Sequence, residues 1–255
     1  MKQLKSMFKV DARRMFTSPL VYIMFGISLI MPVLILVMTT MMGDMTSVDP
    51  VTGVETTMEG FKNVWQAIGS VSTAEMGMDL TSMCNINLIF FMVMIFVCIF
   101  VSEDFRSGYA KNLFTIRAKR VDYVASKTLI CFIASTVMLL LFFIGAMIGG
   151  AIAGLPFTME GFNAGGIICS MVAKTFLALV FISIALTMAC VGKQRLWLSI
   201  LCVLGAGMLL FMMIPMITPL DANLMHVIMC IAGGAIFAIG LGAVSKLILN
   251  KTSLV

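Results

Sequence analysis

The chain has 255 residues, of which 61% are hydrophobic and only 11% charged, and its mean hydropathy is +1.10. A soluble domain is roughly 45–50% apolar and about 25% charged, so this composition excludes a soluble globular domain and predicts a polytopic membrane protein. The net charge of +5 is therefore read as a signal of membrane orientation rather than of nucleic-acid binding. The seven cysteines lack CxxC spacing and are interpreted as packing residues.

Residues 1–18 form a basic, amphipathic segment. On a helix, apolar side chains such as Met7 and Phe8 share one face, and the cations lie on the other. These cations are Lys2, Lys5, Lys9 and Arg13. The pattern predicts an interfacial helix in the plane of the lipid headgroups. Asp11 falls on the apolar side, where we expect a local ion pair with Arg14 or, alternatively, a contact with another part of the protein.

Six later stretches are each long and apolar enough to cross a hydrocarbon core of about 30 Å. They are residues 20–42, 83–101, 124–155, 165–191, 196–218 and 224–247. Pro215 and Pro219 fall at the end of the fifth stretch, where we expect a short irregular or re-entrant piece. Small residues at four-residue spacing, such as Gly145 and Gly149, favour close helix packing, either within one chain or between subunits.

The positive charges are distributed asymmetrically. Fifteen of the seventeen Lys and Arg residues lie in the N-terminal segment, residues 102–127, the turn at 193–195 and the C-terminal tail, against Lys62 alone on the other loops. Because such residues concentrate on the cytoplasmic side, we expect both termini and the loop 102–123 to be cytoplasmic. The long loop 43–82 is then extracellular, as a lid on the bundle or a vestibule that gates release.

Lys174 is the remaining cation and lies within the fourth stretch. We expect its side chain to snorkel toward the interface, with a contact in a substrate path as the alternative. The sequence has no GxxxxGK[ST] motif, a single histidine (His226) and no paired carboxylates inside a predicted span. We therefore expect no catalytic residue, metal or cofactor in this chain, and any energy for transport would come from a separate protein.

The longest charged run, residues 102–127, lies between the second and third stretches. Ser107-Gly108 is a helix breaker, and residues 109–115 are predicted to form a short helix with one apolar face. A short helix held between two spans can dock in a groove of a soluble partner. A lipid-facing loop with interfacial aromatic residues is the alternative.

This run resembles the membrane-spanning subunit of ATP-binding-cassette (ABC) transporters of the type-2 permease family. The matching residues are Glu103-Asp104-Phe105, Ser107-Gly108, Lys111-Asn112-Leu113, Arg120, Tyr123 and Lys127. An amphipathic leader followed by six spans is similar to that family as well. By this resemblance, residues 1–18 are an elbow helix and residues 109–115 a coupling helix, within one all-α permease domain that covers residues 1–255.

The resemblance also implies roles for particular residues. Nine of them would couple the chain to an ATPase: Glu103, Asp104, Phe105, Gly108, Tyr109, Lys111, Asn112, Leu113 and Phe114. Eight cations would anchor the chain at the membrane interface: Lys2, Lys5, Lys9, Arg13, Arg117, Lys119, Arg120 and Lys127.

The implied partners are two copies of a cytoplasmic ABC ATPase, which would hold ATP and Mg, and a second permease, identical or paralogous. The chain would then be the permease subunit of an ATP-driven exporter in a bacterial plasma membrane. Its substrate would be amphipathic or apolar, such as an antimicrobial peptide or a drug. The alternatives are an ion-extruding permease of the same family, and a stand-alone secondary transporter or membrane scaffold.

Overall fold

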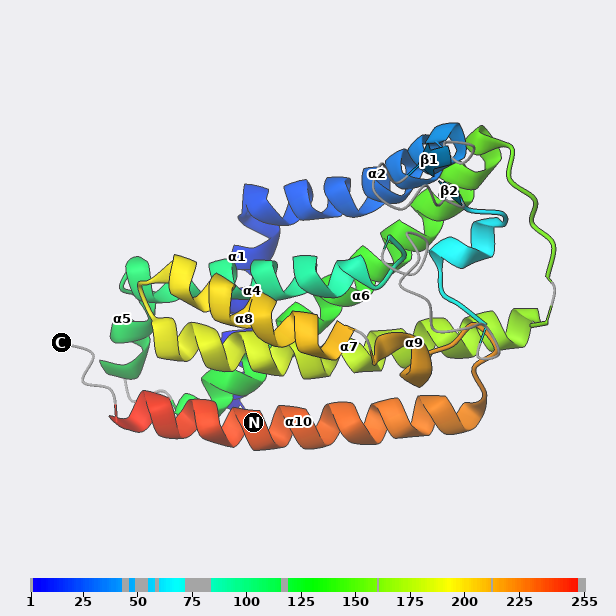
Figure 1. The fold of residues 1–255 in the computed structure, drawn as a ribbon. Coiled ribbons are helices and arrows are strands. Elements are labelled where there is room, and N and C mark those ends of the chain that lie inside the picture. Colours follow the sequence, from blue (N-terminus) through cyan, green and yellow to red (C-terminus); the bar gives the residue numbers. More distant parts are fainter. Residues whose placement is uncertain are drawn as a thin grey trace.

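The computed structural model describes residues 2–42, 46–48, 55–57, 60–71, 84–115, 119–159, 161–211 and 213–251. In chain order the elements are α1 (Lys2–Thr17), α2 (Pro19–Met42), the strands β1 (Thr46–Val48) and β2 (Glu55–Thr57), the 3₁₀ helix η1 (Val64–Ala67), α4 (Leu88–Arg106), α5 (Tyr109–Thr115), α6 (Arg120–Ala153), α7 (Ala164–Gly192), α8 (Leu196–Phe211), α9 (Ile214–Ile217) and α10 (Leu224–Lys251). The long helices form one bundle (Figure 1), and the two short strands pair antiparallel beside it. The predicted all-α polytopic fold is confirmed.

Five of the described helices are long and apolar enough to cross a membrane, namely α2, α4, α6, α7 and α10. The α4 and α7 helices are the most buried of these, and the rings of Phe90 and Phe181 stack between them with centroids 4.7 Å apart. In contrast, α2 and α10 keep many large apolar side chains exposed. An exposed apolar surface of this extent fits contact with lipid rather than with water.

The predicted fifth span is divided into two helices. The first, α8, has 16 residues, which corresponds to about 24 Å at 1.5 Å per residue and is shorter than a hydrocarbon core of about 30 Å. The second, α9, carries Pro215 in its first turn, where the missing N–H is tolerated, and Pro219 follows it. The irregular piece expected at these two prolines is therefore present.

The α1 helix lies crosswise to the long helices and packs against α6 (Figure 1). Its Met7 and Met15 side chains are buried, whereas Lys5, Lys9 and Arg13 are exposed. This division of side chains confirms the predicted amphipathic helix. A helix that runs across a bundle of spans is suited to lie along the membrane surface.

Glycines allow α2 to approach α6 closely. A Cβ atom at Gly145 would overlap the backbone of α2 at Leu29 and the ring of Pro32. A Cβ atom at Gly149 would lie 2.8 Å from the Cα of Val33, which is also too close. These two small residues therefore pack within one chain, which decides between the two alternatives left open by their spacing.

The two ends of the bundle carry different features. The basic end holds α5, the turn at 193–195 and the last turn of α10, with α1 beside it (Figure 1). The opposite end is covered by residues 60–71, which we call the cap, and we refer to it as the cap end. Within the cap, Phe61, Val64 and Ile68 are buried and form an inward apolar face, of which only η1 is helical.

The helices around the charged run differ from the predicted spans. The α4 helix begins at Leu88 rather than at residue 83 and extends to Arg106, so Glu103, Asp104 and Phe105 belong to its last turn. The α6 helix begins at Arg120 rather than at residue 124. Most of the loop 43–82 and residues 116–118 lie outside the described residues.

Candidate functional site

The turn between α4 and α5 is built around Gly108. Its φ is +73°, a left-handed conformation that glycine adopts without steric cost. The hydroxyl of Ser107 donates a hydrogen bond of 2.7 Å to the carbonyl of Glu103 and helps to end α4. The chain then turns back so that α5 packs beside α4. The helix covers Tyr109–Thr115, the same residues as the predicted coupling helix.

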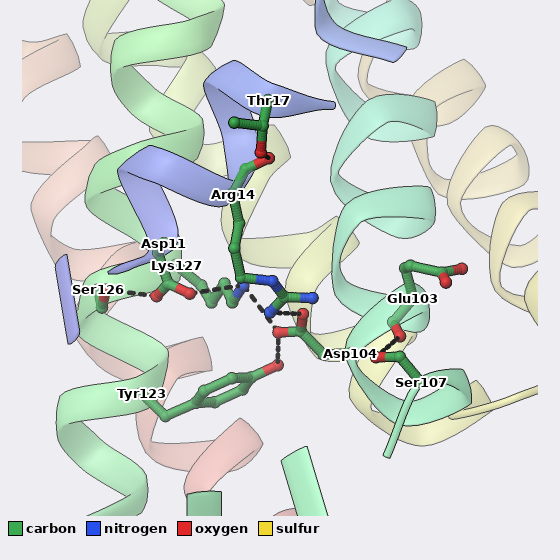
Figure 2. A network of polar contacts seen from close by, with 9 residues as sticks. All are labelled: Asp11, Arg14, Thr17, Glu103, Asp104, Ser107, Tyr123, Ser126 and Lys127. Carbon is green, nitrogen blue, oxygen red and sulfur yellow. Dashed lines mark hydrogen bonds and ion pairs between the residues drawn. The ribbon is translucent and has the colours of Figure 1, made fainter. Parts of the chain in front are cut away.

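Asp104 is the centre of a buried polar cluster that joins three helices (Figure 2). Its Oδ1 accepts a hydrogen bond of 2.6 Å from Nη1 of Arg14 on α1. Its Oδ2 accepts a hydrogen bond of 2.9 Å from the Tyr123 hydroxyl on α6 and lies 2.7 Å from Nζ of Lys127. The same Nζ lies 3.0 Å from Oδ1 of Asp11 on α1. Asp104 thus connects the end of α4 to both α1 and α6.

We call this group the charge cluster, and it comprises Asp11, Arg14, Asp104, Tyr123, Ser126 and Lys127. Its two carboxylates face two cations, so the formal charges cancel. The Ser126 hydroxyl donates a hydrogen bond of 2.6 Å to Oδ2 of Asp11. Taking a charge out of water costs several kcal/mol unless partners offset it. The balanced set explains how Lys127 and Asp104 are accommodated with no exposed side-chain surface.

Aromatic side chains attach α5 to the charge cluster. The guanidinium of Arg14 lies 4.0 Å from the centre of the Tyr109 ring, which belongs to the first residue of α5. The Phe114 ring, also on α5, packs edge-on against Tyr123 at a centroid distance of 5.4 Å. Cation–π and edge-to-face contacts of this kind each contribute about 0.5–1.5 kcal/mol. The α5 helix therefore rests on the same side chains that join α1, α4 and α6.

Two groups at the rim of the charge cluster have shifted pKa values. Burial by itself would lower the pKa of Arg14, but the charge of Asp104 and its hydrogen bond outweigh burial and raise it. The pKa of the Tyr109 phenol is raised, mainly by burial and further by the carboxylates of Asp11 and Asp104. Arg14 therefore remains a cation and Tyr109 a neutral ring at physiological pH.

A further contact ties this region to the C-terminal helix. Nη1 of Arg120, at the start of α6, donates a hydrogen bond of 2.8 Å to Oδ1 of Asn250 near the end of α10. The guanidinium of Arg120 also lies 5.5 Å from the centre of the Phe114 ring. The basic end consequently links α1, α4, α5, α6 and α10 through side-chain contacts.

The outward face of α5 is polar, which differs from the predicted apolar docking face. Lys111, Asn112 and Thr115 are exposed, whereas Leu113 and Phe114 are half-buried. The reason is that the aromatic residues of α5 pack inward on the charge cluster. A partner that approaches this end would meet charged and polar side chains first.

Among the other predicted coupling residues, the structure separates buried from exposed positions. Asp104 and Phe105 are buried, so neither side chain is presented at the surface. Glu103 is exposed and points away from the charge cluster (Figure 2), with Oε2 3.9 Å from Nη1 of Arg106. Neighbouring residues of one helical turn thus have different environments because successive side chains point in different directions.

The cations predicted as interface anchors also differ in exposure. The exposed ones are Lys5, Lys9, Arg13 and Lys119, and Arg120 is half-buried. Lys127 is buried between two carboxylates, so its interpretation as a headgroup anchor is wrong. Arg117 and the side chain of Lys2 lie outside the described part of the chain.

Asp11 does not pair locally as expected. It bonds to Lys127 and Ser126 of α6, while Arg14 bonds to Asp104. The sequence contained one signal of this arrangement, because an acid on the apolar face of an amphipathic helix requires a partner in the protein that the face contacts.

Lys174 does not snorkel either. Its side chain is buried, and Nζ donates hydrogen bonds to Oγ1 of Thr218 at 2.8 Å, to the Thr218 carbonyl at 3.0 Å and to Oδ1 of Asn87 at 3.2 Å. The preferred interpretation from sequence is therefore wrong, because these acceptors hold the ammonium inside the bundle.

A bundle of long apolar helices, with a short helix fixed at one basic end, is the architecture of a multi-pass membrane protein. The family model described as ABC-2 family transporter protein matches residues 17–193, well over half of the chain. The chain therefore belongs to the ABC-2 family of transporter proteins and is a permease subunit of an ABC transporter, as its resemblance predicted. No curated protein and no solved structure matches the chain.

Proposed function

We propose that this permease belongs to an ATP-driven exporter and that α5 receives the motion of a separate cytoplasmic ATPase. The observation that carries the proposal is the attachment of α5 to the charge cluster. Because Arg14 and Tyr123 each bond to Asp104 and also contact an aromatic ring of α5, a displacement of α5 acts on α1, α4 and α6 together. Packed helices that move as one unit are a common route from a local contact to a global switch.

The orientation follows from charge. The basic end would face the cytoplasm, with both termini, and the cap end would face outward. The exposed cations Lys5, Lys9 and Arg13 of α1 support this placement, since a helix at the inner surface gains from anionic headgroups. The anionic leaflet would then lie beside α1, and the ATPase would lie beyond α5.

In this arrangement the ATPase contacts the polar face of α5, with Lys111, Asn112 and Thr115 at its centre and Glu103 beside it. ATP and Mg would be held by the ATPase, present in two copies, and two permease subunits would form the pathway. Closure of the ATPase dimer on ATP would tilt the bundle from inward-facing to outward-facing. The resemblance to the permease family supports these partners.

The substrate we propose is amphipathic or apolar, such as an antimicrobial peptide or a drug. The chain contains 26 Met and 19 Phe residues, and flexible thioether side chains adapt to irregular apolar surfaces. The proposal is tested by growth of the host in the presence of cationic amphipathic peptides. We expect cells with the wild-type subunit to tolerate a peptide that inhibits cells carrying an Asp104→Asn variant.

The ATPase contact is tested by photo-crosslinking in intact membranes. A photoreactive phenylalanine derivative replaces Asn112 on α5, and a matched control replaces Met159, which is exposed near the cap end. We expect position 112 alone to capture a protein with a Walker-A sequence, and the purified complex to hydrolyse ATP. Capture of lipid only at position 112, or the same products from both positions, would contradict the proposal.

A further inference from the structure

Lys174 is a buried cation whose hydrogen-bond acceptors are all neutral. It lies ten residues into α7, about 15 Å along the helix from its start at the cap end. Its three hydrogen bonds, two to Thr218 and one to Asn87, use all three ammonium protons, and every acceptor is neutral. In the part of the chain that the structure describes, no carboxylate forms an ion pair with Lys174. It therefore differs from Lys127, which lies between two carboxylates.

These bonds connect three separate segments near the cap end. Thr218 follows α9, and because the helix ends there its carbonyl has no helical partner and accepts hydrogen bonds from α7 instead, from Lys174 and, at 3.4 Å, from the Ser170 hydroxyl. Asn87 precedes the first residue of α4, and Lys174 belongs to α7. The Thr218 hydroxyl in turn donates a hydrogen bond of 3.0 Å to the carbonyl of Ile214 in α9. One ammonium group thus joins α4, α7 and the break in the fifth span.

The cap lies directly over this ammonium. A Cβ atom at Gly69 would be 3.8 Å from Nζ of Lys174. The backbone of the cap is bonded to the segments that Lys174 joins, because the Leu220 amide donates to the Ser70 carbonyl at 2.9 Å. The Ile86 amide likewise donates to the Ala67 carbonyl at 2.8 Å. Lys174 therefore lies beneath the cap and has no exposed surface.

The neutral acceptors make this arrangement easier to reverse than an ion pair, because release of Lys174 leaves no carboxylate without a partner. A hydrogen bond to a charged group contributes about 1.5–3 kcal/mol net, since water replaces it when it breaks. A lysine inside a membrane protein, however, gains hydration once water reaches it, which an apolar residue would not. Opening the cap end would thus exchange protein acceptors for water, and hydration of the ammonium would offset part of the cost of the lost bonds. Balanced alternatives of this kind allow a packed structure to switch between two states.

We propose that Lys174 is the latch of a gate at the cap end: its bonds to Thr218 and Asn87 hold the gate closed, and their release admits water to the bundle. This inference rests on the proposed export function, in which the cap end must open to release substrate. It assigns Lys174 a positioning role, through the segments that it joins, rather than a static place in the core.

Water access is measured at native cysteines with a membrane-impermeant maleimide, and mass spectrometry resolves each site. Cys230 is buried six residues into α10, about 9 Å along the helix from its start at the cap end (Figure 1), so it reports opening at that end. Cys190 is buried near the other end of α7 and reports loosening of the whole bundle. The variants are Thr218→Val, which removes one acceptor, and Lys174→Ala. The matched control is Thr175→Val, whose hydroxyl bonds only within α7.

We expect Thr218→Val to speed labelling of Cys230 about tenfold, which corresponds to about 1.4 kcal/mol, and Lys174→Ala to speed it further. Labelling of Cys190 should not change, and Thr175→Val should match the wild type. The proposal fails if neither latch variant changes the labelling rate of Cys230, or if the labelling rate of Cys190 rises in parallel. This arm needs no ATPase, so its result is independent of the crosslinking test.

A second arm uses the wild-type chain in complex with an ATPase captured through α5. Trapping the complex with MgATP and vanadate should raise the labelling rate of Cys230 above that of the nucleotide-free complex. An unchanged rate in a complex that hydrolyses ATP would overturn the gate while leaving the ATPase partnership intact.

Discussion

Replacing Asp104 with asparagine tests whether the charge cluster holds the basic end together. The substitution keeps the shape of the side chain and removes one negative charge. The cluster would then contain two cations, Arg14 and Lys127, and a single carboxylate, Asp11. The amide oxygen can still accept the hydrogen bond of Tyr123, so the change isolates the ion pairs.

The expected loss follows from the burial of each partner. Removing one member of a buried ion pair costs about 3–5 kcal/mol. Here the Arg14 side chain is 30% exposed and regains water, so its share of the loss is reduced. Lys127 has no exposed surface and keeps only Asp11, at 3.0 Å. We therefore expect Asp104→Asn to lower the free energy of unfolding by about 3 kcal/mol, the lower end of that range.

The assay is SDS-titrated unfolding in mixed micelles, followed by tryptophan fluorescence. The matched control is Glu103→Gln, because Glu103 is the adjacent acid, 57% exposed and 3.9 Å from Arg106. An exposed pair of this kind contributes less than about 1 kcal/mol. Equal losses in the two variants would refute the reasoning, because they would show that burial of the cluster makes no difference to stability.

Further predictions concern packing and backbone geometry, measured in the same titration. Gly145→Ala should lower the free energy of unfolding by about 1–3 kcal/mol through overpacking against α2. Gly26→Ala should cause no overpacking, because nothing lies within 4 Å of the added Cβ. At Gly108 an added Cβ meets nothing within 4 Å, but φ is +73°, so Gly108→Leu forces a left-handed conformation on a leucine. It should cost about 1–2 kcal/mol and uncouple ATP hydrolysis from transport. Tyr123→Phe removes one of the hydrogen bonds to Asp104 and should cost about 1.5 kcal/mol; no loss would show that the bond is dispensable.

Local signals in the sequence were sufficient to predict two elements, one at each end of the bundle. The bounds of α5 could be predicted because Gly108 supplies a break and the following residues keep helical periodicity. Likewise, Pro215 and Pro219 located the division of the fifth span, since proline interrupts helical hydrogen bonding. Both predictions depend on residues close in sequence, for which backbone chemistry decides the outcome.

The side-chain contacts between different helices could not be predicted from local signals. That Asp11 bonds to Lys127 depends on how α1 is rotated and positioned along α6, which periodicity within α1 does not determine. The acceptors of Lys174 have the same origin: the Thr218 carbonyl is available only because α9 ends there and lies against α7. In both cases a lysine assigned to the interface is buried, because tertiary contacts supply partners that an isolated helix lacks.

The two buried lysines suggest how motion would pass through the bundle if both proposals hold. At the basic end, Lys127 is held by two carboxylates, and separating them would leave buried charges of both signs without partners. At the cap end, Lys174 is held by neutral oxygens. A force applied at α5 would therefore leave the charge cluster intact and break the weaker bonds of Lys174 first. The difference in partner charge would thus make the basic end a rigid input and the cap end the place that opens.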